Sequence, residues 1–163
     1  MDGGTLLLAV MYNDDGVLTE ALAEIEKHFS AVFFKMRDYD FDFTDYYKDE
    51  FGDNLKKTVF VLDSKIRKDD LVDIKMLCSQ IEGDFSKDGK RSINIDPGYF
   101  NREEVVIASF KGKDFKEELE DGVFAHKVLE FDGDKANDPP HTFADFKSRD
   151  VHDFFLNIRA AYY

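Results

Sequence analysis

The spacing of hydrophobic residues along the chain predicts three amphipathic helices. Apolar side chains recur every three or four positions in residues 14–29, 67–85 and 148–163, so that each segment would present one apolar face as a helix. Asn13 or Asp14 can cap the first of these helices, because their side-chain oxygens accept hydrogen bonds from the first free backbone N–H groups.

Shorter apolar runs between the helices predict strands. Residues 5–12 form a continuous apolar run, which suits a strand that is buried on both faces. Residues 31–43 alternate between apolar and polar, but the alternation changes parity near Arg37 and Asp38, which requires a bulge or a break there. Two further strands are predicted at residues 57–62 and 92–96.

The segment after residue 96 mixes turn, helix and strand signals. Pro97-Gly98 is a turn dipeptide, so we expect it to stop the preceding strand. Asn101 with Glu104 resembles a capping box, which predicts a helix over residues 102–111, although the Val and Ile residues there leave a strand open.

Extended structure is predicted again towards the C-terminal third of the chain. Residues 122–131 predict a strand, in a hairpin with residues near 116–120, and residues 132–140 are expected to form a loop.

The order of the first six elements predicts the fold class. Strand, helix, strand, strand, helix, strand is the order of a ferredoxin-like split βαβ arrangement, so we expect an α+β protein with a βαββαβ core. This core would take up residues 5–96 of a single domain, and residues 97–163 would add a helix, a strand and a helix. We expect an antiparallel core sheet with its first and fourth strands central and two helices on one face.

Composition and charge narrow the function classes. The 163 residues are 43% hydrophobic and 35% charged, which is typical of one globular domain. A net charge of −13 repels nucleic-acid phosphates and anionic lipid, and the basic residues between Lys56 and Lys75 are interleaved with acids, as on a solvated face. The only cysteine, Cys78, lies on an apolar helix face, so we expect it to be buried and unreactive.

Targeting and catalytic motifs are absent from the sequence. The chain starts without a basic signal-peptide region and has no apolar stretch near the ~20 residues that span a bilayer, so the expected location is the cytoplasm and no membrane is expected. Phosphate-loop, dinucleotide-binding, HExxH and GxSxG patterns do not occur, and one cysteine cannot build a zinc site.

An acidic, aromatic segment between residues 38 and 50 is the first candidate site. Asp38, Asp40 and Asp42 would point the same way in a strand, either as ligands of a divalent ion or as a solvated acidic edge, and we favour the solvated edge for the first two. A turn at Thr44-Asp45-Tyr46 would point two hydroxyls and a carboxylate inward.

The end of the strand at residues 92–96 is the second candidate. Asn94 and Asp96 share one strand face, and the turn after them would present Asp96 and Tyr99. A purely structural turn explains these residues equally well. Among the histidines only His141, in a loop after two prolines, is a candidate for chemistry, and a plain surface position is the favoured interpretation.

These two segments carry a family resemblance. FDFTDYY (Phe41–Tyr47) followed by NIDPGY (Asn94–Tyr99) resembles a bacterial and archaeal family catalogued as a domain of unknown function, number four-four-one-six, and the similarity runs over nearly the whole chain. The family implies no established activity. The chain departs from its pattern near residues 113–117, 122–126 and 141–146. The polar positions that still match are Thr44, Asp45, Asn94, Asp96 and Asp145.

The sequence therefore predicts one polar site on a cytoplasmic α+β protein. Asp45 and Asp96 would be metal ligands or a general acid/base pair, close enough for one ion or water to bridge them, with at least one raised pKa. Arg91 or Lys113 would receive an anionic substrate. A divalent metal ion is the one cofactor that these residues suggest. The remaining ligand-binding candidates are Thr44, Tyr46, Asn94, Tyr99, His141 and Asp145.

The alternative is a non-catalytic module that binds a protein partner. Its acidic edge and tyrosines would form the interface, since aromatic side chains anchor protein contacts. The tyrosines in question are Tyr39, Tyr46, Tyr47 and Tyr99.

Overall fold

The computed structural model describes residues 2–163, and its strands join in one nine-stranded antiparallel sheet. In chain order the strands are β1 (Gly3–Tyr12), β2 (Val32–Lys35), β3 (Tyr39–Asp40), β4 (Lys56–Arg67), β5 (Ile93–Phe100), β6 (Glu104–Ser109), β7 (Glu117–Glu118), β8 (Phe124–Asp132) and β9 (Lys135–Asn137). Their order across the sheet is β2-β4-β1-β5-β6-β8-β7, with β3 also paired to β4 and β9 to β8.

Four α-helices accompany the sheet: α1 (Asp15–Glu26), α2 (Lys48–Phe51), α3 (Asp70–Asp84) and α4 (Arg149–Tyr162). The three long helices confirm the periodicity of the sequence, whereas the single turn of α2 was not predicted. Asp14 caps α1 by accepting hydrogen bonds from Gly16 and Val17, and Ser148 caps α4 in the same way. No helix within residues 2–163 has both the length and the apolar character that crossing a membrane requires.

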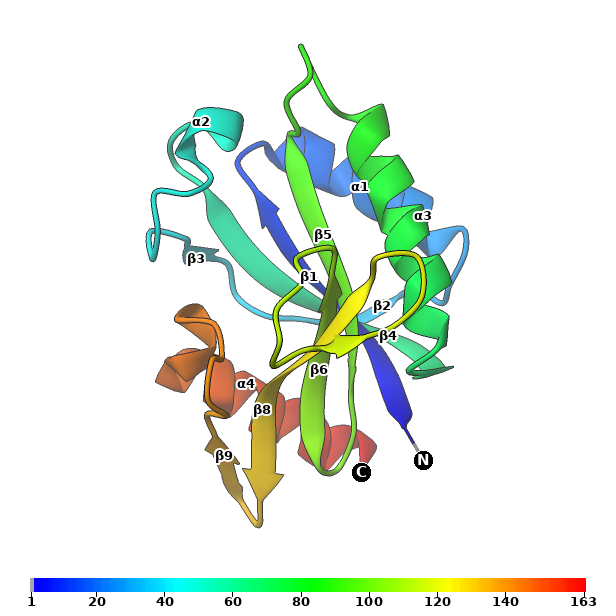
Figure 1. Ribbon diagram of the computed structural model, residues 1–163, viewed down its shortest axis with the longest axis vertical. Coiled ribbons are helices and arrows are strands. Elements are labelled where there is room, and N and C mark those ends of the chain that lie inside the picture. The colour runs from blue at the N-terminus through cyan, green and yellow to red at the C-terminus, as the bar shows by residue number, and fades with distance from the viewer. Residues whose placement is uncertain (1) are drawn as a thin grey trace.

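Strand β1 lies inside the sheet and is buried on both faces, as the apolar run predicts. Among the four strands of the expected core, however, the inner pair is the first and the third (β1 and β4) and not the first and the fourth, because β4 lies between β1 and β2. Leu6, Leu8 and Val10 pack with side chains of α1 and α3, while Leu7 and Ala9 point to the other face and pack with side chains of α4. Figure 1 shows α1 and α3 together on one side of the sheet and α4 on the other. The structure is therefore an α+β fold with helices on both faces of a large antiparallel sheet.

The predicted break in the second extended segment is also present. Strand β2 ends at Lys35 and β3 begins at Tyr39, and the pairing of β2 with β4 is already irregular between Val32 and Phe34. Between these strands Met36 is buried and its N–H donates to Val59 O. The break between β2 and β3 therefore lies where the change of parity predicts it.

The expectation that Pro97-Gly98 stops a strand is wrong. Strand β5 runs through both residues to Phe100 and pairs with β1 along its whole length, so the core boundary expected after Asp96 falls inside a strand. A Cβ at Gly98 would lie 2.1 Å from Val106 O, so glycine is required there because the backbone of β6 approaches closely.

The expected helix over residues 102–111 is a strand, β6. Asn101 does accept hydrogen bonds from the N–H groups of Glu103 and Glu104, but it does so in the turn that joins β5 to β6. An Asn side chain can accept these hydrogen bonds both at the start of a helix and in a hairpin turn. The β-branched residues that follow, Val105 to Ile107, favour the strand.

The C-terminal third is close to the expectation. Strands β7 and β8 form the predicted hairpin, but the segment expected to be a loop over residues 132–140 contains β9, which pairs back on β8.

Cys78 is buried on the apolar face of α3, as predicted, and burial raises the pKa of its thiol to about 12.

Candidate functional site

The sheet forks where β5 and β6 part, and the candidate site lies in this fork. Strand β5 is paired with β1 from Ile93 to Phe100, but with β6 only from Gly98 to Phe100. Pro97 stands at the branch point, where the missing N–H of proline removes one possible bond of the ladder. Residues 93–97 therefore have one open edge inside the protein.

Two charged side chains of α3 replace the missing strand along this edge. Glu82 Oε2 accepts a hydrogen bond from Ile95 N at 2.6 Å, and Lys75 Nζ donates to Ile95 O at 3.0 Å. Both side chains are buried. Buried backbone groups need partners, so Lys75 and Glu82 stabilise the open edge directly.

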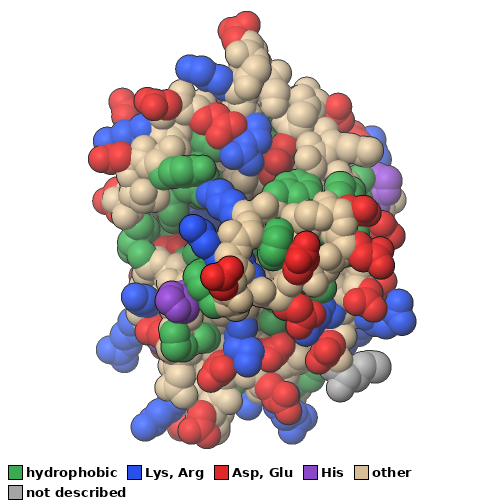
Figure 2. All heavy atoms as spheres, in the orientation of Figure 1, with side chains coloured by type: hydrophobic (Ala, Val, Ile, Leu, Met, Phe, Trp, Pro, Cys, Tyr) green, Lys and Arg blue, Asp and Glu red, His purple; other side chains and the backbone are tan. Residues whose placement is uncertain are grey.

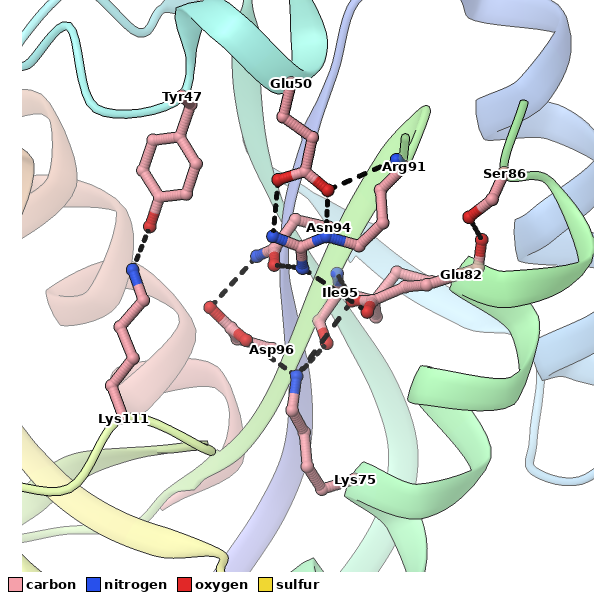
Figure 3. Close-up of polar contacts among 10 residues, drawn as sticks. All are labelled: Tyr47, Glu50, Lys75, Glu82, Ser86, Arg91, Asn94, Ile95, Asp96 and Lys111. Atoms are coloured by element: carbon pink, nitrogen blue, oxygen red, sulfur yellow. Dashed lines mark hydrogen bonds and ion pairs between the residues drawn. The ribbon is translucent and has the colours of Figure 1, made fainter. Parts of the chain in front are cut away.

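The same lysine begins a chain of polar contacts that reaches α2 (Figure 3). Lys75 Nζ lies 2.9 Å from Asp96 Oδ1, and Asn94 donates to the other oxygen of Asp96 at 3.1 Å. Arg91 donates to Asn94 Oδ1 at 2.6 Å and holds both carboxylate oxygens of Glu50, at 2.7 and 3.0 Å. These contacts fix the side chains of the fork in one arrangement.

The electrostatics of the network keep Asp96 ionised. Burial is the largest single influence on Asp96 and would raise its pKa. The charge and hydrogen bond of Lys75, the charge of Lys57 and the hydrogen bond from Asn94 together outweigh burial, so the pKa lies below its ordinary value. In Glu82 the balance is reversed, because burial outweighs Lys75 and raises the pKa of that carboxyl. The expectation of a raised pKa is therefore wrong for Asp96.

An aromatic compartment opens on one side of Asp96. It has a volume of about 380 Å³ and is walled mainly by rings from the segment before α2 and from the loop before α4. Its lining includes Met11, Phe41, Phe43, Thr44, Tyr46, Tyr47, Lys57, Asp96, Lys111, Phe143, Ala144 and Asp145.

A polar compartment of about 330 Å³ adjoins it. The two compartments share Tyr47, Asp96, Lys111 and Phe143 as walls, so we treat them as one cleft, named the forked cleft. The polar side is lined further by Lys75, Ser79, Glu82, Arg91, Asn94, Ser109, Phe110 and Lys116. Figure 2 shows blue Lys and Arg side chains beside green hydrophobic ones in a hollow of this face, while red acidic side chains are spread over much of the rest.

A buried ion pair lines the aromatic compartment. Lys57 Nζ lies 2.8 Å from Asp145 Oδ2, which also accepts a hydrogen bond from the Tyr39 hydroxyl at 2.7 Å. The ammonium group lies over the rings of Phe41 and Phe143, at 5.2 and 5.6 Å from their centroids. Both charges are satisfied within the protein, so this pair serves as a rigid wall of the compartment.

The structure does not bring Asp45 to Asp96 as a pair. The side chain of Asp45 is 87% exposed and its carboxylate contacts Lys48, one turn along the same segment, at 3.1 Å. Thr44 accepts a hydrogen bond from Tyr46 N, so the turn satisfies itself locally and does not point the Asp45 carboxylate inward. Asp45 lines neither compartment of the forked cleft.

Three other candidates lie outside the cleft lining. Tyr99 is fully buried on the α3 side of β5 and donates to Glu104, because the strand continues where a turn was expected. His141 stacks on Phe115 in an exposed loop, and Lys113 is exposed. The candidates that do line the cleft are Thr44, Tyr46, Arg91, Asn94, Asp96 and Asp145.

The ion-binding interpretation of the acidic segment finds no ligand set. Among residues 2–163, no three His, Cys, Asp or Glu side chains are grouped so that they could hold a metal ion. Asp38 lies 3.2 Å from Lys35, and Asp40 and Asp42 are exposed. Of the two residues for which a solvated edge is favoured, Asp40 is exposed, whereas the side chain of Asp38 is only 34% exposed.

Several cleft residues could not be found from the sequence. Lys57 and Lys75 were assigned to a solvated basic face, but both are buried and both pair with carboxylates. The spacing of α3 does place Lys75 and Glu82 two turns apart on one side of the helix, which is a signal for a shared environment. For Lys111 and Lys116, nothing in the sequence apart from their charge indicates that they line the cleft.

Comparison with known proteins yields one match. A family model that describes a domain of unknown function covers residues 2–162, nearly the whole chain. No curated protein and no solved structure matches.

Proposed function

The chain belongs to that family, Domain of unknown function (DUF4416), and we propose that it binds a small organic molecule in the forked cleft. The observation that carries the proposal is the aromatic compartment, a 380 Å³ space with rings on several sides and the ionised Asp96 at its junction with the polar compartment. Ligand sites combine apolar walls with a few fixed polar groups in this way.

The walls favour a ligand with a flat, apolar ring. Tyr46, Tyr47 and Phe41 come from one segment and Phe143 from another, so a ring can contact aromatic faces or edges on more than one side. Tyr46 is 70% exposed and packs against Tyr47 with ring centroids 4.9 Å apart. A large exposed ring at the rim of a cleft is an available stacking surface.

Asp96 supports binding more than acid catalysis. A carboxylate held ionised by Lys75 and Asn94 accepts hydrogen bonds but has no proton to give. A donor group of the ligand, such as a hydroxyl or an amine, would satisfy its remaining lone pairs.

The alternative of a tyrosine-rich protein interface has less support. Of its four tyrosines, Tyr99 is fully buried and the Tyr39 hydroxyl is bonded to the buried Asp145. Tyr46 alone among the four is largely exposed.

We also assign the strands β2, β4, β1 and β5, with α1 and α3, to a ferredoxin-like unit. In the antiparallel order β2-β4-β1-β5, strand β4 lies between β1 and β2, and helix α1 connects β1 to β2 along the chain. Helices α1 and α3 both pack on the same face of these strands. That is the arrangement of a split βαβ fold. In this assignment β6 to β9 and α4 extend the unit, and β6 creates the fork.

The test uses 2-naphthol, an uncharged ring compound, in a titration followed by naphthol fluorescence. We expect wild-type protein to bind it and Tyr46→Ala to bind it about tenfold more weakly, because one ring contact and the apolar area that it buries are lost. Phe33→Ala is the matched control, since Phe33 is 62% exposed on β2 and does not line the cleft. No binding by wild-type protein, or equal binding by the Tyr46 variant, contradicts the proposal.

A further inference from the structure

We infer that the polar compartment of the forked cleft is a subsite for a phosphate monoester, with Lys111 and Lys116 as its binding residues. The inference rests on the proposed function, since the phosphate would belong to the molecule whose ring occupies the aromatic compartment. It starts from the charges that line the polar side.

Four cations and two carboxylates line this compartment. Each carboxylate already has its partners: Asp96 is held by Lys75, and Glu82 by Lys75 and Arg91. Arg91 in turn is held by Glu50. Lys75 and Arg91 are thus shared among three carboxylates, and Lys111 and Lys116 are the two cations of the compartment without a carboxylate partner, in a protein whose net charge is −13.

Both remaining lysines are bonded only to neutral groups. Lys111 Nζ donates to the Tyr47 hydroxyl at 2.8 Å, and Lys116 Nζ donates to Lys111 O at 2.9 Å. Within the described part of the chain, neither amine has a carboxylate within 4.0 Å. An ammonium group has three donors, so each lysine keeps hydrogen-bonding capacity for a ligand.

The positive potential at this position acts on Lys116 itself. Burial lowers the pKa of its amine. The nearby charge of Lys111 lowers it further, against an opposing contribution from Asp96, and Lys113 adds a smaller lowering. An anion between Lys111 and Lys116 would relieve this repulsion, which is a source of binding free energy that a neutral ligand does not have.

The charge of the anion follows from the number of free lysines. A phosphate monoester carries −1.5 to −2 at neutral pH and three acceptor oxygens, which matches two ammonium groups, whereas a carboxylate carries −1. The hydroxyls of Ser79 and Ser109 also line the compartment and can serve further oxygens. The geometry therefore points to a phosphate ester in preference to a carboxylic acid.

The experiment compares three compounds with the same ring: 1-naphthyl phosphate, 1-naphthoate and 1-naphthol, at low ionic strength. We expect the phosphate to bind at least tenfold more tightly than the naphthol and the carboxylate to lie between them. We expect Lys111→Met and Lys116→Met each to reduce the advantage of the phosphate over the naphthol about tenfold. Naphthol binding should be unchanged in Lys116→Met, because Lys116 lines only the polar compartment, and for Lys111, which also lines the aromatic compartment, the ratio of the two affinities is the readout. Raised salt should reduce the same advantage.

Lys113→Met is the matched control, because Lys113 lies in the same loop but outside the cleft lining, and it should keep most of the advantage. Lys111 is exposed, so its variant reports on the subsite even if Lys116→Met were unstable. Equal affinity for phosphate and naphthol, equal affinity for phosphate and carboxylate, or unchanged phosphate binding in both lysine variants overturns this inference while the ring site stands. Absence of binding for all three compounds overturns the proposed function as well.

Discussion

Replacing Lys75 with methionine should destabilise the protein far more than the loss of a surface lysine. Methionine fills much of the space of the lysine stem but removes the amine that donates to Ile95 O and lies 2.9 Å from Asp96. The side chain is only 3% exposed, so water cannot take over these roles. The variant leaves the buried Glu82, the partly exposed Asp96 and one backbone carbonyl without their shared partner.

The size of the effect follows from these losses. Removing one partner of a buried charge pair costs about 3–5 kcal/mol, because the other charge stays buried and uncompensated. Domains of this kind have about 5–15 kcal/mol of stability in total, so the variant should lose a large share of it. Urea unfolding followed by far-UV circular dichroism at pH 7 measures the difference.

Lys27→Met is the matched control for this experiment. Lys27 also forms an ion pair, at 2.8 Å from Glu24, but its side chain is 66% exposed, and its loss should cost less than about 1 kcal/mol. A loss below about 1 kcal/mol for Lys75→Met would refute the role assigned to the buried network.

A second variant separates charge from hydrogen bonding. Glu82→Gln keeps an oxygen for Ile95 N but removes the negative charge. Combined with Lys75→Met, it should cost at least 1 kcal/mol less than the sum of the two single changes, because one uncompensated charge has gone. Additive costs would show that the two side chains act independently.

Three further predictions concern stability and reactivity. Burial and the charge of Lys116 lower the pKa of His126 to about 4, so the folded protein stays neutral at this residue where the unfolded chain takes up a proton. Stability should therefore fall by up to about 3 kcal/mol between pH 6.5 and 4, and urea unfolding of His126→Leu across this range should lack that part of the loss. Gly98→Ala should cost about 3 kcal/mol in the same assay, whereas Gly83→Ala, where an added Cβ meets nothing within 4 Å, should not destabilise the protein. Cys78 should react with a thiol reagent only after urea unfolding, and rapid labelling of the native protein would contradict its assignment.

The elements that the sequence predicted correctly are those whose burial pattern is contained within the segment itself. The apolar run of β1 and the periodic face of α3 each identify their own structure, because burial on two faces or on one stripe is a property of the segment. The parity change near Arg37 likewise requires a break whatever the rest of the chain does.

Other elements depend on partners distant in the sequence. Pro97 and Gly98 signal a turn by themselves, and only the approach of Val106 makes glycine necessary inside a strand. Asn101 bonds the next N–H groups equally well at a helix start and in a hairpin. In both places the backbone conformation depends on pairing with β6, and the residues up to Asn101 contain no pattern that predicts this pairing.

Only part of the candidate site could be predicted from the sequence, because the rest depends on side chains that are distant along the chain. The alternation along the strand places Asn94 and Asp96 on one face, and both side chains line the forked cleft. The partner chosen for Asp96 was another acid, Asp45, but the structure supplies a base from α3, Lys75. A residue spacing of 21 across a helix and a strand leaves no signal in a single sequence.

The central position of β1 has a consequence for the synthesis of the protein. This strand is synthesised before both of its neighbours, β4 and β5, which end only at Arg67 and Phe100. At roughly 5–20 residues per second, the apolar segment stays without its second neighbour for several seconds or longer. During that time one edge of this apolar strand is unpaired, which exposes it to association with other chains. A truncated chain that stops before Ile93 would leave one edge of this strand unpaired and would be expected to aggregate.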